Sequence, residues 1–561
     1  MSSAMAGKAN ASTLEEVQSI GSPARSRIWI PRAASVIGAV YFLAHSLSVI
    51  LGPEQKVMEW LYDDAFYYLI TAKHFSERHL SSFDGITLTS GYHPLWMWLC
   101  SIVYGLHGAL DITYVRWCMG LALAITSSVL LLALRDAWVN RRAGMLWALA
   151  LGASSYSALN NGLTTMEWSL VLLSWFLMHV LVTSPARRSA MQLMPIFLVG
   201  IAGSLSRSDF GLVPASYFAA AILLGLRSGT WNTARRAAAG LAGSIAGMPV
   251  IFLYNHSMTG SWLQGSARVK GLAASLASPF DVGPALWQFT RVLLYLPPLD
   301  IDPSIRAHLL HLAARVLGGV AVLAATWLLL SKVPLLAILQ RCCLPQSLDD
   351  SVLTASLLGV GGYLLLDGFN SLATYGWYSA VVTGFLLLLS ARLLQKLRVY
   401  VAAAIVVPLM LANMATAFLC GGNAKSQMQE VYVGKAMHAD HPGALLAGGD
   451  VGKPSFYNNG TMVNLDGLMN NEVIPYLATG RIHCYVLRRH LEYLSGIGSI
   501  VQSVSDAERV RHGESPIPWT KYFTPVDAPP AYGRNESTVP VLYFKTNFAA
   551  IRASGECLRE E

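Results

Sequence analysis

Two adjacent acids, Asp63 and Asp64, stand shortly after the first long apolar run of the chain, in the segment "LYDDAFYYLITAKHFSE". An ionised carboxylate at the surface of a bilayer is costly unless it is solvated, paired with a cation or used in chemistry. The pair could form the first turn of an amphipathic helix, where acids favour the helix dipole and face water. Alternatively, one of the acids could accept the proton of an attacking hydroxyl group.

Other polar residues could share a site with this pair, although they come from distant parts of the sequence. They are His93 in "SGYHPLW", Arg116 in "YVRW", Glu167 in "NNGLTTMEW", Arg207 and Asp209 in "LSRSDF", and Lys270 in "SARVKG". Three outward-facing cations beside acids are suited to binding a lipid-linked phosphate. Two of the cations also have an ordinary explanation, because Arg207 could simply pair with Asp209 and Lys270 could be a solvated loop lysine.

His93, Glu167 and a further residue, Tyr378, each allow more than one interpretation. His93 precedes Pro94 at a helix start, so it could bind a phosphate, orient an acid or cap the helix. Glu167 could hold an acceptor, complete a metal site with the carboxylate pair, or cap the following helix. Tyr378, next to Trp377, could stack on a sugar or a prenyl chain, or serve as an aromatic anchor at the membrane surface.

The composition indicates the setting in which these residues act. Of 561 residues 54% are hydrophobic and 13% are charged, and the mean hydropathy is +0.45, which predicts a polytopic membrane protein. The net charge of +8 follows loops on one membrane face, so we expect no nucleic-acid partner. Seven cysteines without a CxxC pair argue against a zinc site and a dense disulfide scaffold, but one bridge among Cys420, Cys484 and Cys557 is an option.

Apolar runs long enough to span a bilayer recur along most of the chain and predict about eleven transmembrane helices. The runs cover residues 33–51, 113–134, 143–159, 168–182, 191–205, 211–226, 238–253, 316–330, 352–366, 379–394 and 399–419. The positive-inside bias places the N-terminus in the cytoplasm. The apolar run 93–110 is interpreted as a re-entrant or interfacial helix. Counting it as a span would move the arginine pairs at 141–142 and 187–188 to the outer face.

This topology divides the chain into three parts. We expect a cytoplasmic tail over residues 1–32 and a helical membrane domain over 33–419, with outer loops at 52–112 and 255–308. The first outer loop contains a predicted amphipathic helix that lies along the membrane. From residue 420 to 561 the composition is that of a soluble α/β domain, which this topology places outside the cytoplasm.

The polar segments, in their order along the chain, resemble those of the polytopic GT-C glycosyltransferases. The segments are "YDDAFYY", "FDGITLTSGYHPLW", "YVRW", "GLTTMEW" and "LSRSDF". The pattern is most similar to the protein O-mannosyltransferases and the lipid A aminoarabinose transferases, and it covers residues 33 to about 270. The hallmark acidic pair of that family falls on Asp63 and Asp64, and its "HPP"-like segment falls on His93 and Pro94, with Leu95 in place of the second proline.

Three further positions follow from the same resemblance. The family arginine that heads the next span falls on Arg116. The acid of the second outer loop falls on Glu167, displaced by a residue or two. The segment "VNLDGLMN", which contains Asp466, resembles a part of the soluble tail of some bacterial members.

The resemblance implies an inverting hexosyl or pentosyl transferase in the cytoplasmic membrane. It would move a sugar from a polyprenyl-phosphate donor to a hydroxyl of a glycan, lipid or protein acceptor on the outer face, in contact with membrane lipids. Asp63 is the preferred proton acceptor and Asp64 would orient the acceptor, while Arg116, Arg207 and Lys270 would stabilise the departing phosphate. No cofactor is required, with a divalent metal as a second option.

The alternative function is a transporter or flippase of lipid-linked sugars. A transporter typically binds its substrate near the bilayer midplane on broken helices and often contains an internal repeat. The polar residues here gather instead at the predicted outer ends of the spans, and no repeat is evident in the sequence.

Overall fold

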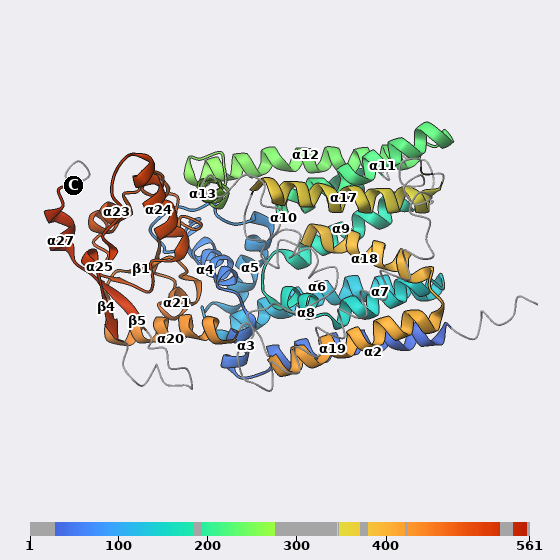
Figure 1. Cartoon of the computed structure of the whole chain (residues 1–561), viewed down its shortest axis with the longest axis horizontal. Coiled ribbons are helices and arrows are strands. Elements are labelled where there is room, and N and C mark those ends of the chain that lie inside the picture. Colours follow the sequence, from blue (N-terminus) through green and yellow to red (C-terminus); the bar gives the residue numbers. More distant parts are fainter. Residues whose placement is uncertain are drawn as a thin grey trace, which may run out of the picture.

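The computed structural model describes residues 28–184, 193–274, 345, 347–370, 380–420, 424–527 and 542–557. In this part of the chain the long helices lie side by side, and an α/β domain stands at one end of them (Figure 1). Short helices, including α4 and α5, occupy the space between the long helices and that domain (Figure 1). The two parts therefore meet along a layer that belongs to residues 52–112, the predicted first outer loop (Figure 1).

The helical part contains helices of very different lengths. The helices are α2 (Trp29–Ile50), α3 (Glu54–Trp60), α4 (Asp63–Arg78), α5 (Pro94–His107), α6 (Ile112–Val139), α7 (Ala143–Ser154), α8 (Tyr156–Leu163), α9 (Trp168–Thr183), α10 (Leu193–Ser206), the 3-10 turn η3 (Ser208–Gly211), α11 (Leu212–Ser228), α12 (Asn232–Thr259), α13 (Gly265–Ala274), α17 (Leu348–Asn370), α18 (Ala380–Gln395) and α19 (Val399–Cys420).

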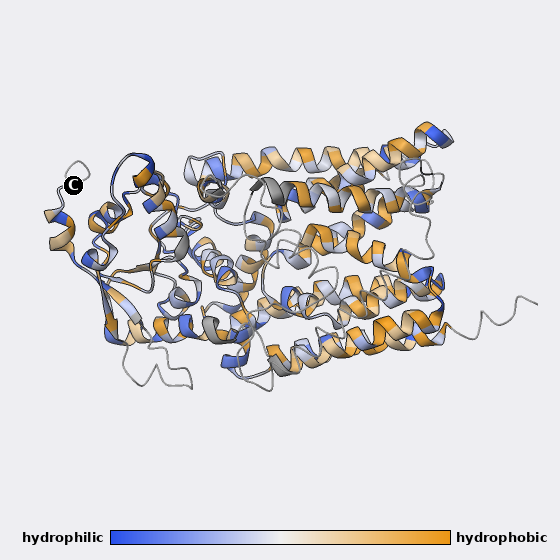
Figure 2. Cartoon of the chain, viewed as in Figure 1, coloured by the Kyte–Doolittle hydropathy of each residue, from blue (hydrophilic) through white to orange (hydrophobic). Residues whose placement is uncertain are grey.

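Five helices of the described residues are long and apolar enough to cross a membrane. They are α2, α6, α11 with its preceding turn, α12 and α19, and a sixth candidate arises if α8 and α9, bent by 110°, form one broken span. Hydrophobic residues run along these helices in Figure 2, whereas the α/β domain is more hydrophilic. At most half of each apolar window is buried inside the molecule, so the remaining apolar surface faces outward as in a lipid-exposed helix.

The prediction of about eleven spans therefore stands only in part. The helices α7, α10 and α18 are apolar but have 12, 14 and 16 residues, shorter than the roughly 20 residues needed to cross a hydrocarbon core without adjustment. The run 316–330 lies outside the described residues.

The helices of the predicted first outer loop are enclosed by the rest of the molecule. Most side chains of α4 are buried, and Phe66 lies edge-on against Phe456 of the α/β domain. This burial differs from an amphipathic helix with one side in water, because the α/β domain covers that side of α4. Helix α5 has 14 residues, too few for an ordinary span, and the indole of Trp96 is buried and donates to the carbonyl of Thr165 at 2.6 Å.

The α/β domain is built on a five-stranded mixed sheet of order β2-β1-β3-β5-β4. Strand β1 is parallel to β2 and β3, and β5 is antiparallel to β3 and β4. The strands are β1 (Leu446–Gly448), β2 (Val463–Asn464), β3 (Tyr493–Leu494), β4 (Phe523–Asp527) and β5 (Leu542–Thr546). The helices are α20 (Ala424–Asp440), α21 (Gly452–Tyr457), α22 (Ile474–Ala478), α23 (Ile482–Arg488), α24 (Ser499–Arg511), α25 (Trp519–Tyr522) and α27 (Phe548–Ala553).

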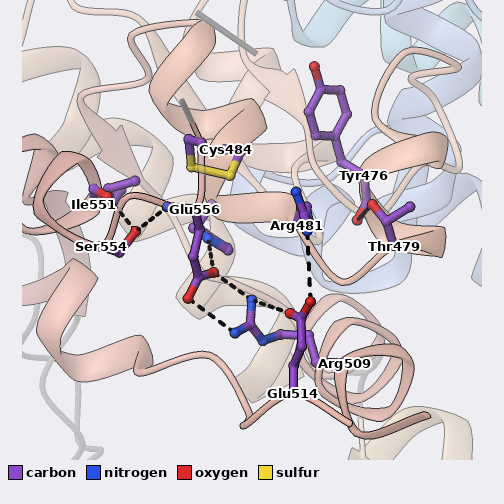
Figure 3. Close-up of a disulfide and its surroundings, with 11 residues drawn as sticks. Tyr476, Thr479, Arg481, Cys484, Arg509, Glu514, Ile551, Ser554 and Glu556 are labelled. Atoms are coloured by element: carbon purple, nitrogen blue, oxygen red, sulfur yellow. Dashed lines mark hydrogen bonds and ion pairs between the residues drawn. A yellow bond between two sulfur atoms is a disulfide. The ribbon is translucent and has the colours of Figure 1, made fainter. Parts of the chain in front are cut away.

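A disulfide between Cys484 and Cys557 closes this domain (Figure 3). It joins α23 to the segment that follows α27. Beside it, Glu556 pairs with the guanidinium of Arg509 at 2.6 Å and with Nε2 of His483 at 3.0 Å. The bridge and this acid together tie the end of the described chain to the sheet domain.

Replacing both bridge cysteines with serine should lower the free energy of unfolding of the α/β domain by about 2–4 kcal/mol, because the unfolded chain regains the entropy of a long open loop. Thermal unfolding in detergent measures the change. A reductant should lower the transition of the unaltered protein and have no effect on the double variant. Equal transitions for the unaltered protein with and without reductant would contradict a stabilising bridge.

Candidate active site

Residues from five separate segments meet in one small cavity where the α/β domain covers the helices. The segments are the first turns of α4, the loop before α5, the turn before α9, the residues around α13, and the loop after β2. The lining residues are Asp64, Tyr67, Tyr68, Gly91, Tyr92, His93, Met166, Glu167, Gln264, Ser266, Lys270, Leu468 and Met469. The cavity measures about 50 Å³, well below the roughly 300 Å³ of a small-molecule site, so substrate access requires the walls to separate.

Asp64 lies in this cavity at the start of α4. Burial, and next the charge of Asp63, raise the pKa of the Asp64 carboxyl to about 7, against the opposing effect of Lys270. A carboxylate with a pKa near neutrality is suited to accept a proton and to release it again. Burial also raises the pKa of Asp63, so it is the position of Asp64 in the cavity that fits this acid for the role of a general base.

Asp63 lies outside the cavity and contacts the α/β domain instead. One carboxylate oxygen accepts the backbone N–H of Gly452 at 2.8 Å and the other accepts that of Lys453 at 2.7 Å. The side chain is 7% exposed. Each oxygen accepts one backbone donor of the α/β domain, and the side chain does not line the cavity, so Asp63 is less accessible to an acceptor hydroxyl than Asp64 is.

Glu167 and Arg207 form the centre of a buried polar network at the cavity wall. Glu167 accepts hydrogen bonds from the hydroxyl of Tyr68 at 2.7 Å and from Nη1 of Arg207 at 3.0 Å. Arg207 also donates to both carboxylate oxygens of Asp209, at 2.9 and 2.7 Å. The pairing of Arg207 with Asp209 matches one of the two interpretations of the sequence, and it fixes the guanidinium between two acids.

His93 and Lys270 complete the polar wall of the cavity. The Nε2 atom of His93 lies 4.0 Å from a carboxylate oxygen of Glu167. Burial lowers the pKa of His93 to about 4, so the ring is neutral at physiological pH and acts as a hydrogen-bonding group rather than a cation. Burial also lowers the pKa of Lys270, which the charge of Asp64 partly offsets. Lys270 is thus the cation most directly coupled to Asp64.

Arg116, another predicted site residue, does not join this group. Arg116 donates to the carbonyl of Gly52 at 2.7 Å, at the end of α2, and it does not line the cavity. It stands near the start of α6, where it binds the neighbouring backbone instead of reaching the cavity. Tyr378 lies outside the described residues.

The α/β domain supplies parts of the site that the sequence did not assign. Leu468 and Met469 line the cavity, and an added Cβ on Gly91 would meet the carbonyl of Leu468 at 1.6 Å, so the two loops are in tight contact. Asp466 faces the hydroxyl of Tyr67 at 3.5 Å. Asp466, Leu468 and Met469 belong to the segment "VNLDGLMN", whose family resemblance was visible in the sequence. The apolar residues in it, however, have no sequence feature that indicates binding.

A divalent metal held by the carboxylate pair was a second option from the sequence, beside a site that needs no cofactor. Among the described residues, one group of three side chains brings its ligand atoms within 4.8 Å of one another, namely His483, Cys484 and Cys557. Its two cysteines form the disulfide. The acids of the cavity do not converge in this way, and we derive no step through a metal.

Comparison with known proteins adds a fold likeness. No protein-family model and no curated protein matches the sequence. The chain is similar to the crystal structure of the Archaeoglobus fulgidus oligosaccharyltransferase, tethered with an acceptor peptide containing the NVT sequon via a disulfide bond. The TM-score is 0.45 and the identity 13%, over 83% of this chain and 69% of that chain. A likeness of this degree carries no argument about the reaction, which rests on the cavity itself.

Proposed function

We propose that the protein is an inverting glycosyltransferase. It moves a hexosyl or pentosyl group from a polyprenyl-phosphate donor to an acceptor hydroxyl on the outer face of the cytoplasmic membrane. The observation that carries the proposal is the shared cavity of Asp64, His93, Glu167 and Lys270 where the α/β domain meets the membrane helices. A proton acceptor, a neutral hydrogen-bonding group and a cation in one enclosed site are the groups that such a transfer needs.

In the proposed reaction Asp64 accepts the proton of the acceptor hydroxyl. The acceptor oxygen attacks the anomeric carbon from the side opposite the phosphate, and the bond between that carbon and the phosphate oxygen breaks. The electron pair of that bond leaves with the polyprenyl phosphate. Because the acceptor oxygen enters from the opposite face in a single displacement, the configuration at the anomeric carbon inverts. Lys270 stabilises the negative charge that grows on the phosphate. His93 donates a hydrogen bond to the same group, and Glu167 with Arg207 holds the wall rigid.

This assignment gives Asp64 the role that the sequence favoured for Asp63. Asp63 becomes a positioning residue, because its carboxylate binds the backbone of Gly452 and Lys453 and not the cavity. Arg116 has no role in the proposed chemistry.

The disulfide supports the proposed location. Disulfides persist in oxidising compartments and are rare in the cytosol. The bridge between Cys484 and Cys557 therefore favours an extracytoplasmic α/β domain, and with it an extracytoplasmic cavity.

The alternative of a transporter for lipid-linked sugars is less favoured by the position of the cavity. Transporter sites lie near the midplane, whereas this cavity lies where the helices end and includes residues of the α/β domain.

The two functions can be separated in proteoliposomes that contain the purified protein. The probes are polyprenyl phosphates carrying radiolabelled mannose, glucose or arabinose, mixed with an extract of the source membranes as the acceptor pool. We expect one donor to yield polyprenyl phosphate together with label in a new product. Movement of intact donor across the bilayer without cleavage, for all three sugars, would contradict the transferase and favour the transporter.

The pKa of Asp64 predicts the pH profile of transfer. The base must be ionised, and a pKa of about 7 leaves roughly one tenth of Asp64 ionised at pH 6. The rate should therefore rise roughly tenfold from pH 6 to 8, and it should fall at alkaline pH as Lys270, whose pKa is lowered, loses its proton.

Asp450 provides a second test of this limb, because it lies outside the cavity but its charge is one of the groups that raise the pKa of Asp64. The variant Asp450→Asn should therefore move the limb to lower pH. A flat profile between pH 6 and 8 in the unaltered protein would refute the role of Asp64.

A further inference from the structure

A second and larger cavity lies at the junction of α2, α3 and α19, where two candidate membrane helices end. It measures about 350 Å³ and shares no residue with the catalytic cavity. We name it the rim cavity, and its lining residues are His45, Ser48, Pro53, Gln55, Lys56, Glu59, Trp60, Ala417 and Phe418. A volume of this size falls within the range of small-molecule sites.

The rim cavity presents one positive and one negative side chain. Lys56 and Glu59 stand one turn apart on α3, and in the described part of the chain no ion pair joins them. The ammonium of Lys56 donates to the hydroxyl of Ser48 at 3.2 Å, and Glu59 accepts from the amide of Gln55 at 2.9 Å. Two opposite charges that face one cavity without neutralising each other are complementary to a ligand that carries both signs.

A buried polar atom deeper in the rim cavity also lacks a partner. The ring of His45 packs edge-on against Trp60, with centroids 5.0 Å apart. Its Nε2 atom is buried and has no hydrogen-bond partner among the described residues. Leaving a buried polar atom unpaired is costly, and a polar atom of a ligand bound in the rim cavity would satisfy it.

The surroundings of the rim cavity are apolar and exposed. Phe418 of α19 is 80% exposed and Leu51, directly after α2, is 76% exposed. Both helices are candidates for crossing the membrane. A ligand bound here would have its polar group between Lys56 and Glu59, while an apolar tail could continue along the two helices.

We propose that the rim cavity binds the headgroup of a zwitterionic phospholipid with a phosphate and a primary ammonium. The phosphate contacts Lys56 and Ser48, and the ammonium contacts Glu59. A polyprenyl phosphate would offer Lys56 the same phosphate but would place its remaining negative charge beside Glu59. The site therefore favours the phospholipid, and this inference does not depend on the reaction in the other cavity.

Native mass spectrometry of the full chain in detergent tests the proposal with three probes added separately. The probes are phosphatidylethanolamine, phosphatidylglycerol and polyprenyl phosphate. The unaltered protein should bind phosphatidylethanolamine most tightly. Glu59→Gln should weaken binding of phosphatidylethanolamine about two- to fivefold, as expected for a partly exposed ion pair, and should leave binding of phosphatidylglycerol unchanged or tighter. Lys56→Gln should weaken binding of both phospholipids to a similar degree.

Two control variants and a filling variant guard against indirect effects. Glu492→Gln and Lys521→Gln change exposed charges of the α/β domain and should not change the binding of any of the three probes. Ser48→Trp should fill the rim cavity and reduce binding of all three probes. The proposal fails if Glu59→Gln leaves the preference for phosphatidylethanolamine over phosphatidylglycerol unchanged, or if the unaltered protein prefers polyprenyl phosphate.

Discussion

Replacing Asp64 with asparagine should lower the rate of sugar transfer by about 10²- to 10⁴-fold while leaving donor binding nearly unchanged. The substitution keeps the shape of the side chain but removes its ability to accept a proton, and general-base catalysis is typically worth this factor. The measurement is the turnover of the labelled donor in proteoliposomes, together with binding of the donor at equilibrium.

Asp63→Asn is the matched control because it makes the same chemical change one residue away. An amide at position 63 offers one acceptor oxygen where the carboxylate accepts from both Gly452 and Lys453. This variant should therefore lower the melting temperature. Asp64→Asn should keep or raise it, because the raised pKa of Asp64 means that its ionised form is unfavourable in the folded protein at pH 8. If Asp64→Asn retains more than half of the transfer rate of the unaltered protein, Asp64 is not the general base.

The polar members of the site could be predicted because charged residues are rare in an apolar chain. A carboxylate or guanidinium near a membrane surface must be solvated, paired or used, so its position in the sequence is informative. Asp64, His93, Glu167 and Lys270 all stood out for this reason, and all of them line one cavity.

The division of labour between Asp63 and Asp64 could not be predicted in the same way. Neighbouring residues on a helix point in directions about 100° apart, so one can face a cavity while the other faces away. Which acid faces the cavity depends on what covers α4, and the covering residues, Gly452 and Lys453, lie 389 and 390 positions further on. Leu468 and Met469 were missed because apolar side chains in a soluble domain look like ordinary core residues.

The number of spans is supported only in part among the described residues, for a related reason. Hydropathy counts apolar runs, but a run can fold into a helix too short to cross the bilayer. Helices α7 and α10 belong to this class. Their apolar side chains are explained by packing inside the protein and not by a full crossing of the bilayer. Helix α7, for example, packs against α2 and α18.

The variant Gly452→Ala should reduce sugar transfer more than tenfold although Gly452 does not line the cavity. A Cβ at this position would meet the backbone oxygen of Asp63 at 2.1 Å and its carboxylate oxygen Oδ1 at 2.9 Å. The first distance involves backbone, which cannot move aside without displacing the first turn of α4 and Asp64 with it. Overpacking of this kind costs about 1–3 kcal/mol, so the contact between α4 and α21 should open.

Gly496→Ala is the control for a glycine-to-alanine change in the same domain. Nothing lies within 4 Å of a Cβ added to Gly496. This variant should therefore keep the transfer rate and the melting temperature of the unaltered protein.

The opening of the contact can be measured independently of activity through Lys453. Its ammonium group is fully buried beside Glu430, at 3.9 Å, and should resist an amine-acetylating reagent in the unaltered protein. In Gly452→Ala the same group should become acetylated, as detected by mass spectrometry of the peptide that contains it. If Gly452→Ala retains full transfer and Lys453 stays protected, the contact between Asp63 and the α/β domain does not position Asp64. If Lys453 becomes acetylated while transfer is unaffected, Asp64 is held by the helices alone, because the base then keeps its place without the domain that covers it.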